Sequence, residues 1–323
     1  MEKKPEISQA GIVDFLGQWT LDISGNKVGW LEIRQEEGYL DGELLWESGS
    51  VSPVTNIYFE GNKLYVGRNT QKIVREKDSV GLELRSHLIP TWLEIQKDGE
   101  KIKGFLLNPG KSGLDVDSIS FTGTKLPEMP DPPDLNNLNF GDPIELFNGK
   151  DLSGWEVAEE GRANGWSVEN GILINNPVQK EGQNIAFGNL KTEKVFNDFN
   201  LKLEVYISEN INSGVYLRGM FEIQVFDSYG KKLDPLNMGA LYSRITPSVN
   251  AEKPAGMWQT MDITLCNRHL TVILNGINII DNKPVYGPTG GALSSDVFAP
   301  GPIMLQGDHG KVSYRNIILK PVL

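Results

Sequence analysis

The sequence has 323 residues, which is too long for one ordinary hydrophobic core and is typical of two domains. Hydrophobic residues make up 39% and charged residues 23%, which excludes a disordered protein. The formal net charge is −11 and no long basic run offsets it, so nucleic acid and anionic membrane surfaces are not expected partners. A neutral ligand such as a sugar is compatible with this charge.

The first residues, MEKKPEISQ, are charged and have no following apolar stretch, so we do not expect a signal peptide in them. No apolar run approaches the roughly 20 residues that span a bilayer, and no membrane span is expected. The single cysteine, Cys266, lies in an apolar strand and is expected to be a buried small residue. We assign residues 1–10 to an N-terminal tail.

Residues 11–125 contain short β-type runs that Gly, Asn and Asp interrupt at about the 8–12-residue spacing of sandwiches and barrels. No segment shows a sustained period of about 3.6 residues, so helices are not expected. The pattern predicts an antiparallel β-barrel or sandwich. Its opening, FLGQWTLD, resembles the short Gly-x-Trp start of lipocalin-like barrels. His87 has no carboxylate or second histidine at a metal-ligand spacing, and we assign it no function.

Residues 126–142 are predicted to form a stiff linker, because this region is rich in Pro, Asp and Asn. The strand patterns of residues 143–323 are longer and more regular, and Asn275-Gly276 between two apolar runs predicts a hairpin. Two long loops, 230–256 and 282–301, are expected to be functional or disordered. We predict a two-sheet jelly roll or laminin-like sandwich.

In the stretch NSGVYLRGMFEIQVFDS, residues 212–228, apolar residues alternate with polar ones. Both apolar sets face the core only if the two strands are joined by a loop with an odd number of residues. We therefore predict a hairpin in which Arg218 lies opposite Glu222 and Tyr216 lies opposite Gln224, on the face away from the core.

This polar face has two interpretations. A surface ion pair contributes only about 0.2–1 kcal/mol and needs no function. Aromatic, amide and charged groups together, however, suit a hydroxyl-rich ligand. The pattern WQTMDIT adds Trp258 and Asp262 on one face, and LQGDHGKVSYRNI adds Gln306, Asp308 and His309. A loop histidine beside a carboxylate can act as an acid or a base near neutral pH, and the alternative is an exposed turn histidine.

Residues 143–323 resemble the family formerly called DUF1080, now the 3-keto-disaccharide hydrolase domain. Six blocks carry the resemblance in the expected order: LFNGKDLSGW, WSVENGIL, SGVYLRGMFEIQVFDS, GALYSRITPSVNAEKPAGMW, TVILNGINIID and LQGDHGKVSYRNIILKP. The resemblance implies a concanavalin-like jelly roll, usually in periplasmic or secreted bacterial proteins that process glycosides. It does not extend to the N-terminal domain, and the sequence leaves a cytoplasmic location open.

The resemblance also implies a substrate that is oxidised to a ketone at sugar C3. Such a ketone acidifies the hydrogen on C2, and loss of that proton expels the aglycone from C1. We expect Glu222 or His309 to be the base, Asp308 to orient His309, and Tyr242 to donate a proton or close the site. Substrate binding is expected from the remaining candidates: Arg218, Gln224, Trp258, Tyr216, Gln306 and Asp262. No tight ligand cluster predicts a metal, and a divalent metal that assists the enolate is left open.

Two alternatives accompany this hypothesis. A conventional retaining glycoside hydrolase needs two carboxylates about 5–5.5 Å apart, whereas Glu222 and Asp227 lie on opposite faces of one strand and further apart. A non-catalytic carbohydrate-binding jelly-roll module would use the same aromatic and amide groups. It would not need Glu222 and His309 together.

Overall fold

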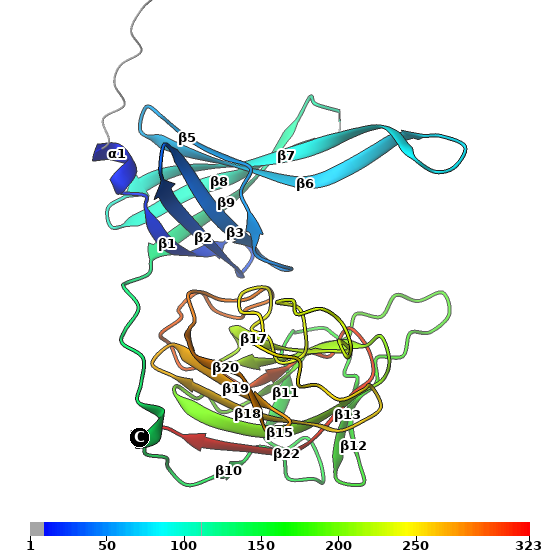
Figure 1. The fold of residues 1–323 in the computed structure, drawn as a ribbon. Helices are drawn as coiled ribbons and strands as arrows, with labels where there is room; N and C mark the ends of the chain where they lie inside the picture. Colours follow the sequence, from blue (N-terminus) through cyan, green and yellow to red (C-terminus); the bar gives the residue numbers. More distant parts are fainter. Residues whose placement is uncertain (1–9, 111) are drawn as a thin grey trace, which may run out of the picture. The chain divides into compact units, whose positions relative to one another are not determined.

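The structure is a computed structural model that describes residues 10–110 and 112–323. The regular elements of the described residues are almost all β-strands, and the helical segments are α1 (Ala10–Val13) and the 3-10 helix η1 (Leu135–Asn137). No helix in these ranges is long and apolar enough to cross a membrane. The chain divides into two compact units between Pro127 and Glu128, which are described separately below (Figure 1). The predicted all-β class is confirmed.

The first unit is one antiparallel sheet in the order β4-β3-β2-β1-β9-β8-β7-β6-β5. Its strands are β1 (Gly17–Ile23), β2 (Lys27–Glu36), β3 (Tyr39–Trp46), β4 (Ser52–Pro53), β5 (Asn56–Glu60), β6 (Lys63–Lys77), β7 (Glu83–Asp98), β8 (Lys101–Pro109) and β9 (Val116–Lys125). The edge strands β4 and β5 follow each other in the chain and are not paired with each other in the described ranges. The sheet therefore does not close into a barrel.

The core of this unit follows the two-residue alternation of the strands. Trp19 and Leu21 of β1 are fully buried, and the Trp19 indole donates a hydrogen bond to the Phe15 carbonyl at 2.8 Å. Each large apolar side chain buried in this way contributes about 1.5–3 kcal/mol. The strands β6 and β7 continue beyond the sheet as a two-stranded ribbon (Figure 1).

The proline-rich segment is fixed to the second unit over much of its length. Asn267 and Asn282 donate side-chain hydrogen bonds to the carbonyls of Asp131 and Pro133, at 2.8 and 3.0 Å. The Gly141 amide donates to the Pro321 carbonyl at 2.9 Å. The end of this segment thus belongs to the second unit and does not hang free.

The second unit is a sandwich of two sheets. One sheet has the order β12-β13-β22-β15-β18-β19-β20, with β10 also paired to β22, and the other has the order β11-β14-β21-β16-β17. The strands are β10 (Ile144–Glu145), β11 (Trp155–Val157), β12 (Trp166–Glu169), β13 (Ile172–Asn175), β14 (Leu190–Thr192), β15 (Phe199–Ile207), β16 (Asn212–Leu217), β17 (Phe221–Phe226), β18 (Gln259–Cys266), β19 (His269–Leu274), β20 (Ile277–Pro284), β21 (Met304–Leu305) and β22 (Val312–Pro321).

Two local predictions for this unit hold. Asn275 and Gly276, with φ of 51° and 84°, form the two-residue turn between β19 and β20, as the Asn-Gly pair predicts. Cys266 is buried, and burial raises the pKa of its thiol to about 11. It is a structural residue and not a reactive thiol.

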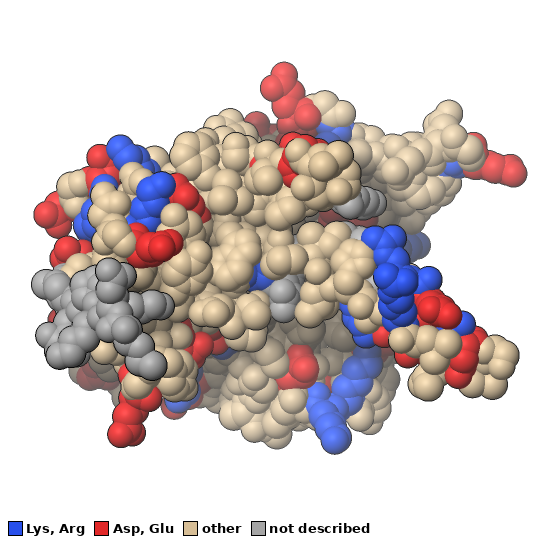
Figure 2. Space-filling view, turned by 90° about the horizontal axis from the view of Figure 1, so that it is seen from above, with Lys and Arg blue, Asp and Glu red and all other residues tan. Residues whose placement is uncertain are grey.

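The face of the molecule in Figure 2 carries charged side chains of both signs. Basic and acidic residues are interspersed in small groups. Among the described residues that this view shows, there is no extended basic surface of the kind that follows a phosphate backbone.

Candidate functional site

The hairpin β16–β17 places the central carboxylate. Its register pairs Tyr216 with Glu222 and Gly214 with Gln224. The connecting loop is residues 218–220, so the odd loop length is correct, but the loop lies one position earlier than predicted and each residue of β17 pairs two residues away from its predicted partner. The reason is that Arg218 leaves the strand and takes a left-handed backbone conformation, with φ of 53°.

Arg218 consequently belongs to the turn. Its guanidinium is buried and donates to the Asn197 side-chain oxygen and the Val297 carbonyl, each at 3.0 Å. It also lies 5.3 Å from the ring centre of Phe221, whose side chain is on the core side of the sheet. Arg218 therefore fixes the turn, and the structure does not support its predicted place beside Glu222 as a ligand for the ketone.

The Glu222 side chain lies on the other face of β17, away from the core, yet it is only 4% exposed. Its Oε2 is 2.9 Å from the Tyr216 hydroxyl, which is also 2.8 Å from the Gly290 carbonyl. The other oxygen leans over Gly214, where an added Cβ would be 2.2 Å from Glu222 Oε1. Glycine is needed at this position because any side chain would occupy the place of the carboxylate.

Burial raises the pKa of Glu222 from 4.5 to about 8, and the hydrogen bond from Tyr216 and the charge of His309 oppose this rise only in part. The hydrogen bonds of Tyr216 also indicate that Glu222 is protonated. Its hydroxyl has one proton for two neighbouring acceptors, so both contacts become hydrogen bonds only when Glu222 itself carries a proton. Glu222 is therefore mainly a neutral acid at pH 7.

His309 and Asp308 form a second titratable pair next to Glu222. His309 Nδ1 lies 2.5 Å from Asp308 Oδ1, and the histidine side chain is 45% exposed. The hydrogen bond to Asp308 raises the pKa of His309, the charge of Asp308 adds to this rise, and Glu222 adds to it when it is ionised. Burial alone would raise the pKa of Asp308, but the hydrogen bond and charge of His309 outweigh burial and lower it. The loop that carries Asp308 and His309 follows β21, which pairs with β16, and the Gln306 backbone amide donates to the Gly214 carbonyl, so this pair lies near the hairpin that carries Glu222.

The buried Asn175 and the half-buried Asn189 hold the loop that carries this pair. The Asn175 amide donates to the carbonyls of Gly307 and Gly310, at 2.8 and 2.9 Å, and Asn189 Oδ1 accepts from the Gly307 amide at 2.9 Å. The sequence pattern did not identify either residue. Their role depends on contacts across more than 100 positions, so no local signal could have revealed it.

Amide groups flank the carboxylate. Gln224 is paired with Gly214 across the hairpin, and the backbone amide of Gln306 donates to the Gly214 carbonyl at 2.9 Å. The Oε1 atoms of both glutamines are buried and have no hydrogen-bond partner among the described residues. Two such oxygens can accept hydrogen bonds from the hydroxyl groups of a ligand. Tyr242 lies at the edge of the same hairpin, where its backbone amide donates to the Glu222 carbonyl at 2.9 Å.

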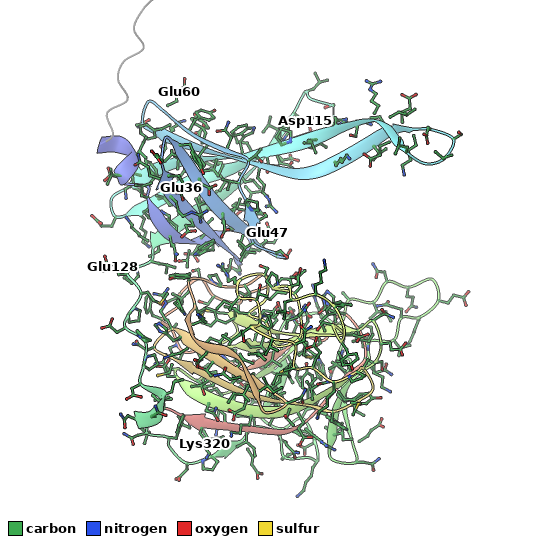
Figure 3. The ribbon with its side chains drawn as sticks, in the orientation of Figure 1. Glu36, Glu47, Glu60, Asp115, Glu128 and Lys320 are labelled. Carbon is green, nitrogen blue, oxygen red and sulfur yellow. The ribbon has the colours of Figure 1, made fainter. Side chains whose placement is uncertain are left out.

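Trp258 and Asp262 do not belong to this cluster. Asp262 lies in β18 and Trp258 immediately precedes it; both alternate with Met261 and Ile263, which face the core, so both point outward from the opposite sheet. Asp262 binds Lys202 at 2.7 Å, and the Arg315 guanidinium lies 4.1 Å from the Trp258 ring centre. Side chains fill the space between the two sheets (Figure 3). The prediction that one site includes both residues is corrected: a sequence gives the face of a strand but not the sheet to which it belongs.

For the long loop after β20 the sequence predicts a functional or disordered segment and indicates no particular site residue. This loop supplies Thr289 and Gly290, which contact the hairpin. Thr289 Oγ1 accepts a hydrogen bond from the Glu222 backbone amide at 2.9 Å, and the Gly290 carbonyl accepts one from the Tyr216 hydroxyl. The described residues contain no group of three or more His, Cys, Asp or Glu that could hold a metal ion.

Residues 142–320 match the family described as the 3-keto-alpha-glucoside-1,2-lyase-like domain, which confirms the predicted family. The chain belongs to this family. It is similar to a candidate glycosyl hydrolase from Parabacteroides distasonis ATCC 8503, at 30% identity and a TM-score of 0.47, over 61% of this chain and 94% of that one. A second such protein of that organism shows 21% identity and a TM-score of 0.45, over 56% and 94%. A Bacillus licheniformis beta-glucanase shows 12% identity and a TM-score of 0.35, over 59% and 100%. No curated protein matches the chain.

The second unit is thus a carbohydrate-active domain of the glycoside-cleaving class. The family and the fold agree with the sequence prediction.

Proposed function

We propose that the second unit cleaves 3-keto-glycosides by eliminating the aglycone. The observation that carries this proposal is the nearness of a neutral acid, Glu222, to the His309–Asp308 pair, whose loop is hydrogen-bonded to β16 of the same hairpin. Groups whose environments set different protonation states are suited to acid and base roles at one pH.

The chemistry follows from the ketone. A base removes the proton from C2, and the electron pair of the C2–H bond passes into an enolate with the C3 carbonyl. The enolate then re-forms the ketone as a C1–C2 double bond forms and the C1–O bond breaks, and the aglycone oxygen takes up a proton. Addition of one water across the double bond completes a net hydrolysis.

His309 is the proposed base, because its exposed ring can reach a substrate and its neutral form accepts a proton. Asp308 holds the ring and stabilises the imidazolium that forms. Glu222 is the proposed acid, because a carboxyl group with a pKa of about 8 carries a proton at neutral pH and can deliver it to the leaving oxygen. This assignment selects His309 from the two bases that the sequence left open.

Gln224 and Gln306 are proposed to accept hydrogen bonds from sugar hydroxyls through their unpartnered oxygens. Tyr242 is proposed to close the site from the edge of the hairpin. Tyr216 is proposed to accept a hydrogen bond from protonated Glu222 and to donate one to ionised Glu222. We also propose that residues 143–323 carry the whole reaction and that the protein is periplasmic or secreted, as the family resemblance implies.

The test uses a 3-keto-glucoside deuterated at C2. The wild-type protein should show a primary isotope effect on aglycone release. His309→Ala should abolish both release and exchange of the C2 hydrogen with solvent. Glu222→Gln should slow release by about 10²–10⁴-fold while C2 exchange continues. His87→Ala, in the first unit, is the matched histidine control. Full activity of His309→Ala would refute the assignment, and sugar binding without turnover by the wild type would favour a binding module.

A further inference from the structure

The outer face of the first unit carries a cluster of aromatic side chains on four neighbouring strands, β5 to β8. We propose that this aromatic face, which consists of Tyr58, Tyr65, Trp92 and Phe105, is a binding surface for a carbohydrate chain. It is separate from the Glu222 cluster and does not depend on the reaction proposed above.

The strand register brings these residues together. Tyr58, Tyr65, Glu94 and Phe105 are successive partners across β5, β6, β7 and β8. The two tyrosine rings stack at 4.8 Å with an interplanar angle of 12°, and Trp92 meets Tyr58 edge-on at 5.8 Å. The neighbours of these residues along the strands, such as Leu64, Val66, Leu93 and Ile95, are fully buried, so the aromatic face points away from the core.

Gly67 determines how Trp92 lies. A Cβ on Gly67 would be 2.9 Å from Cζ3 and 3.0 Å from Cη2 of Trp92, so the six-membered ring covers the place that a side chain would take. Gly67 does not have a positive φ, and its backbone conformation is therefore open to other residues. Its use here is to let the indole ring rest against the sheet and present its other face.

Polar groups are placed within the aromatic face. Glu94 accepts from Lys63 at 2.6 Å and from the Tyr65 hydroxyl at 3.2 Å. Tyr58 and Phe105 are 42% and 48% exposed. Pyranose rings have apolar C–H faces that pack on aromatic rings and hydroxyl edges that need donors and acceptors, and this surface offers both.

The dimensions and the charge favour a sugar chain over a protein. Three strand spacings of about 4.8 Å make the row from β5 to β8 about 14 Å long, which suits a narrow extended ligand. A stable protein interface needs about 800 Å² from each partner. The protein has a net charge of −11, but on this face the carboxylate of Glu94 is paired with Lys63. The pair has no net charge, which suits a neutral polymer. Attachment of this surface to a glycoside-cleaving unit would raise the local substrate concentration without new contacts.

The experiment measures retardation of the full chain in native gels that contain soluble β-glucan, α-glucan or xylan. The wild type should be retarded by at least one polysaccharide. Trp92→Ala and Tyr58→Ala should each weaken that binding about tenfold, since truncation of an aromatic anchor typically has this effect. Gly67→Val should weaken it similarly by displacing the ring without removing it.

Tyr39→Ala is the control, because Tyr39 is an exposed tyrosine on β3 of the same sheet and outside the aromatic face. Glu222→Gln should bind like the wild type, which separates this surface from the catalytic proposal. The proposal is overturned if no polysaccharide retards the wild type, if Tyr58→Ala binds unchanged, or if the variants change only the oligomeric state in solution.

Discussion

Replacement of Gly214 by alanine should displace the Glu222 carboxylate. The new Cβ would lie 2.2 Å from Oε1, 2.8 Å from Cγ and 2.9 Å from Cδ of Glu222, whereas ordinary contacts begin at 3.4 Å. The difference, 3.4 minus 2.2, requires the oxygen to retreat by about 1.2 Å. Gly214 has no positive φ, so the backbone itself tolerates alanine and the effect is confined to this contact.

A misplacement of about 1 Å in a catalytic group can reduce the rate by about 10²-fold, which corresponds to about 2.7 kcal/mol in the barrier. The free energy of unfolding should change less. Overpacking costs about 1–3 kcal/mol, and the reduced flexibility of the unfolded chain returns about 0.4–1 kcal/mol.

The assay is kcat/KM with a 3-keto-glucoside that carries a chromogenic aglycone, together with urea denaturation. Gly141→Ala is the matched control, because its Cβ would meet its nearest neighbour at an ordinary 3.4 Å and it also lacks a positive φ. Wild-type kcat/KM in Gly214→Ala would show that the position of the Glu222 carboxylate does not matter, and would refute the reasoning.

Four further predictions test the site. The pH profile of kcat/KM should rise as His309, with its raised pKa, loses its proton, and fall as Glu222 ionises near pH 8; retention of the alkaline fall in the residual activity of Glu222→Gln would contradict it. Because the folded pKa of Glu222 is raised above 4.5, its contribution to stability is full below about pH 4.5 and is lost as the pH rises through about 8. Thermal unfolding should therefore show the wild type losing stability over this window relative to Glu222→Gln, and parallel curves would be the contrary result. Asn175→Ala removes two buried hydrogen bonds and should cost roughly 1–3 kcal/mol in urea denaturation while lowering kcat more than it changes KM. Trp258→Ala and Arg315→Ala, on the opposite sheet, should leave kcat/KM within about twofold, and a large loss in both would place the site there instead.

The sequence predicts much of the sandwich because strand alternation and turn chemistry are local. The faces of residues in β16–β17 and β18 follow from the two-residue period, and the Asn275-Gly276 turn follows from its need for positive φ. The register of the first hairpin does not follow, because an arginine at a left-handed position has no sequence signal that distinguishes it from a strand residue.

The site is predicted less completely for a related reason. Glu222 lies on an outward face, and the sequence gives no indication that loops from residues 239–245 and 289–291 bury it and change its pKa. The separation of Trp258 and Asp262 from Glu222 depends on which sheet each strand joins. The anchoring of the His309 loop by Asn175 depends on contacts between distant segments.

The most direct measurement of the central claim compares two chromogenic glucosides that differ only in oxidation at C3, each incubated with the purified protein. The account predicts aglycone release from the 3-keto-glucoside alone, at a rate that Glu222→Gln and His309→Ala both reduce. Equal or faster release from the unoxidised glucoside would identify a conventional glycosidase and contradict elimination through a ketone.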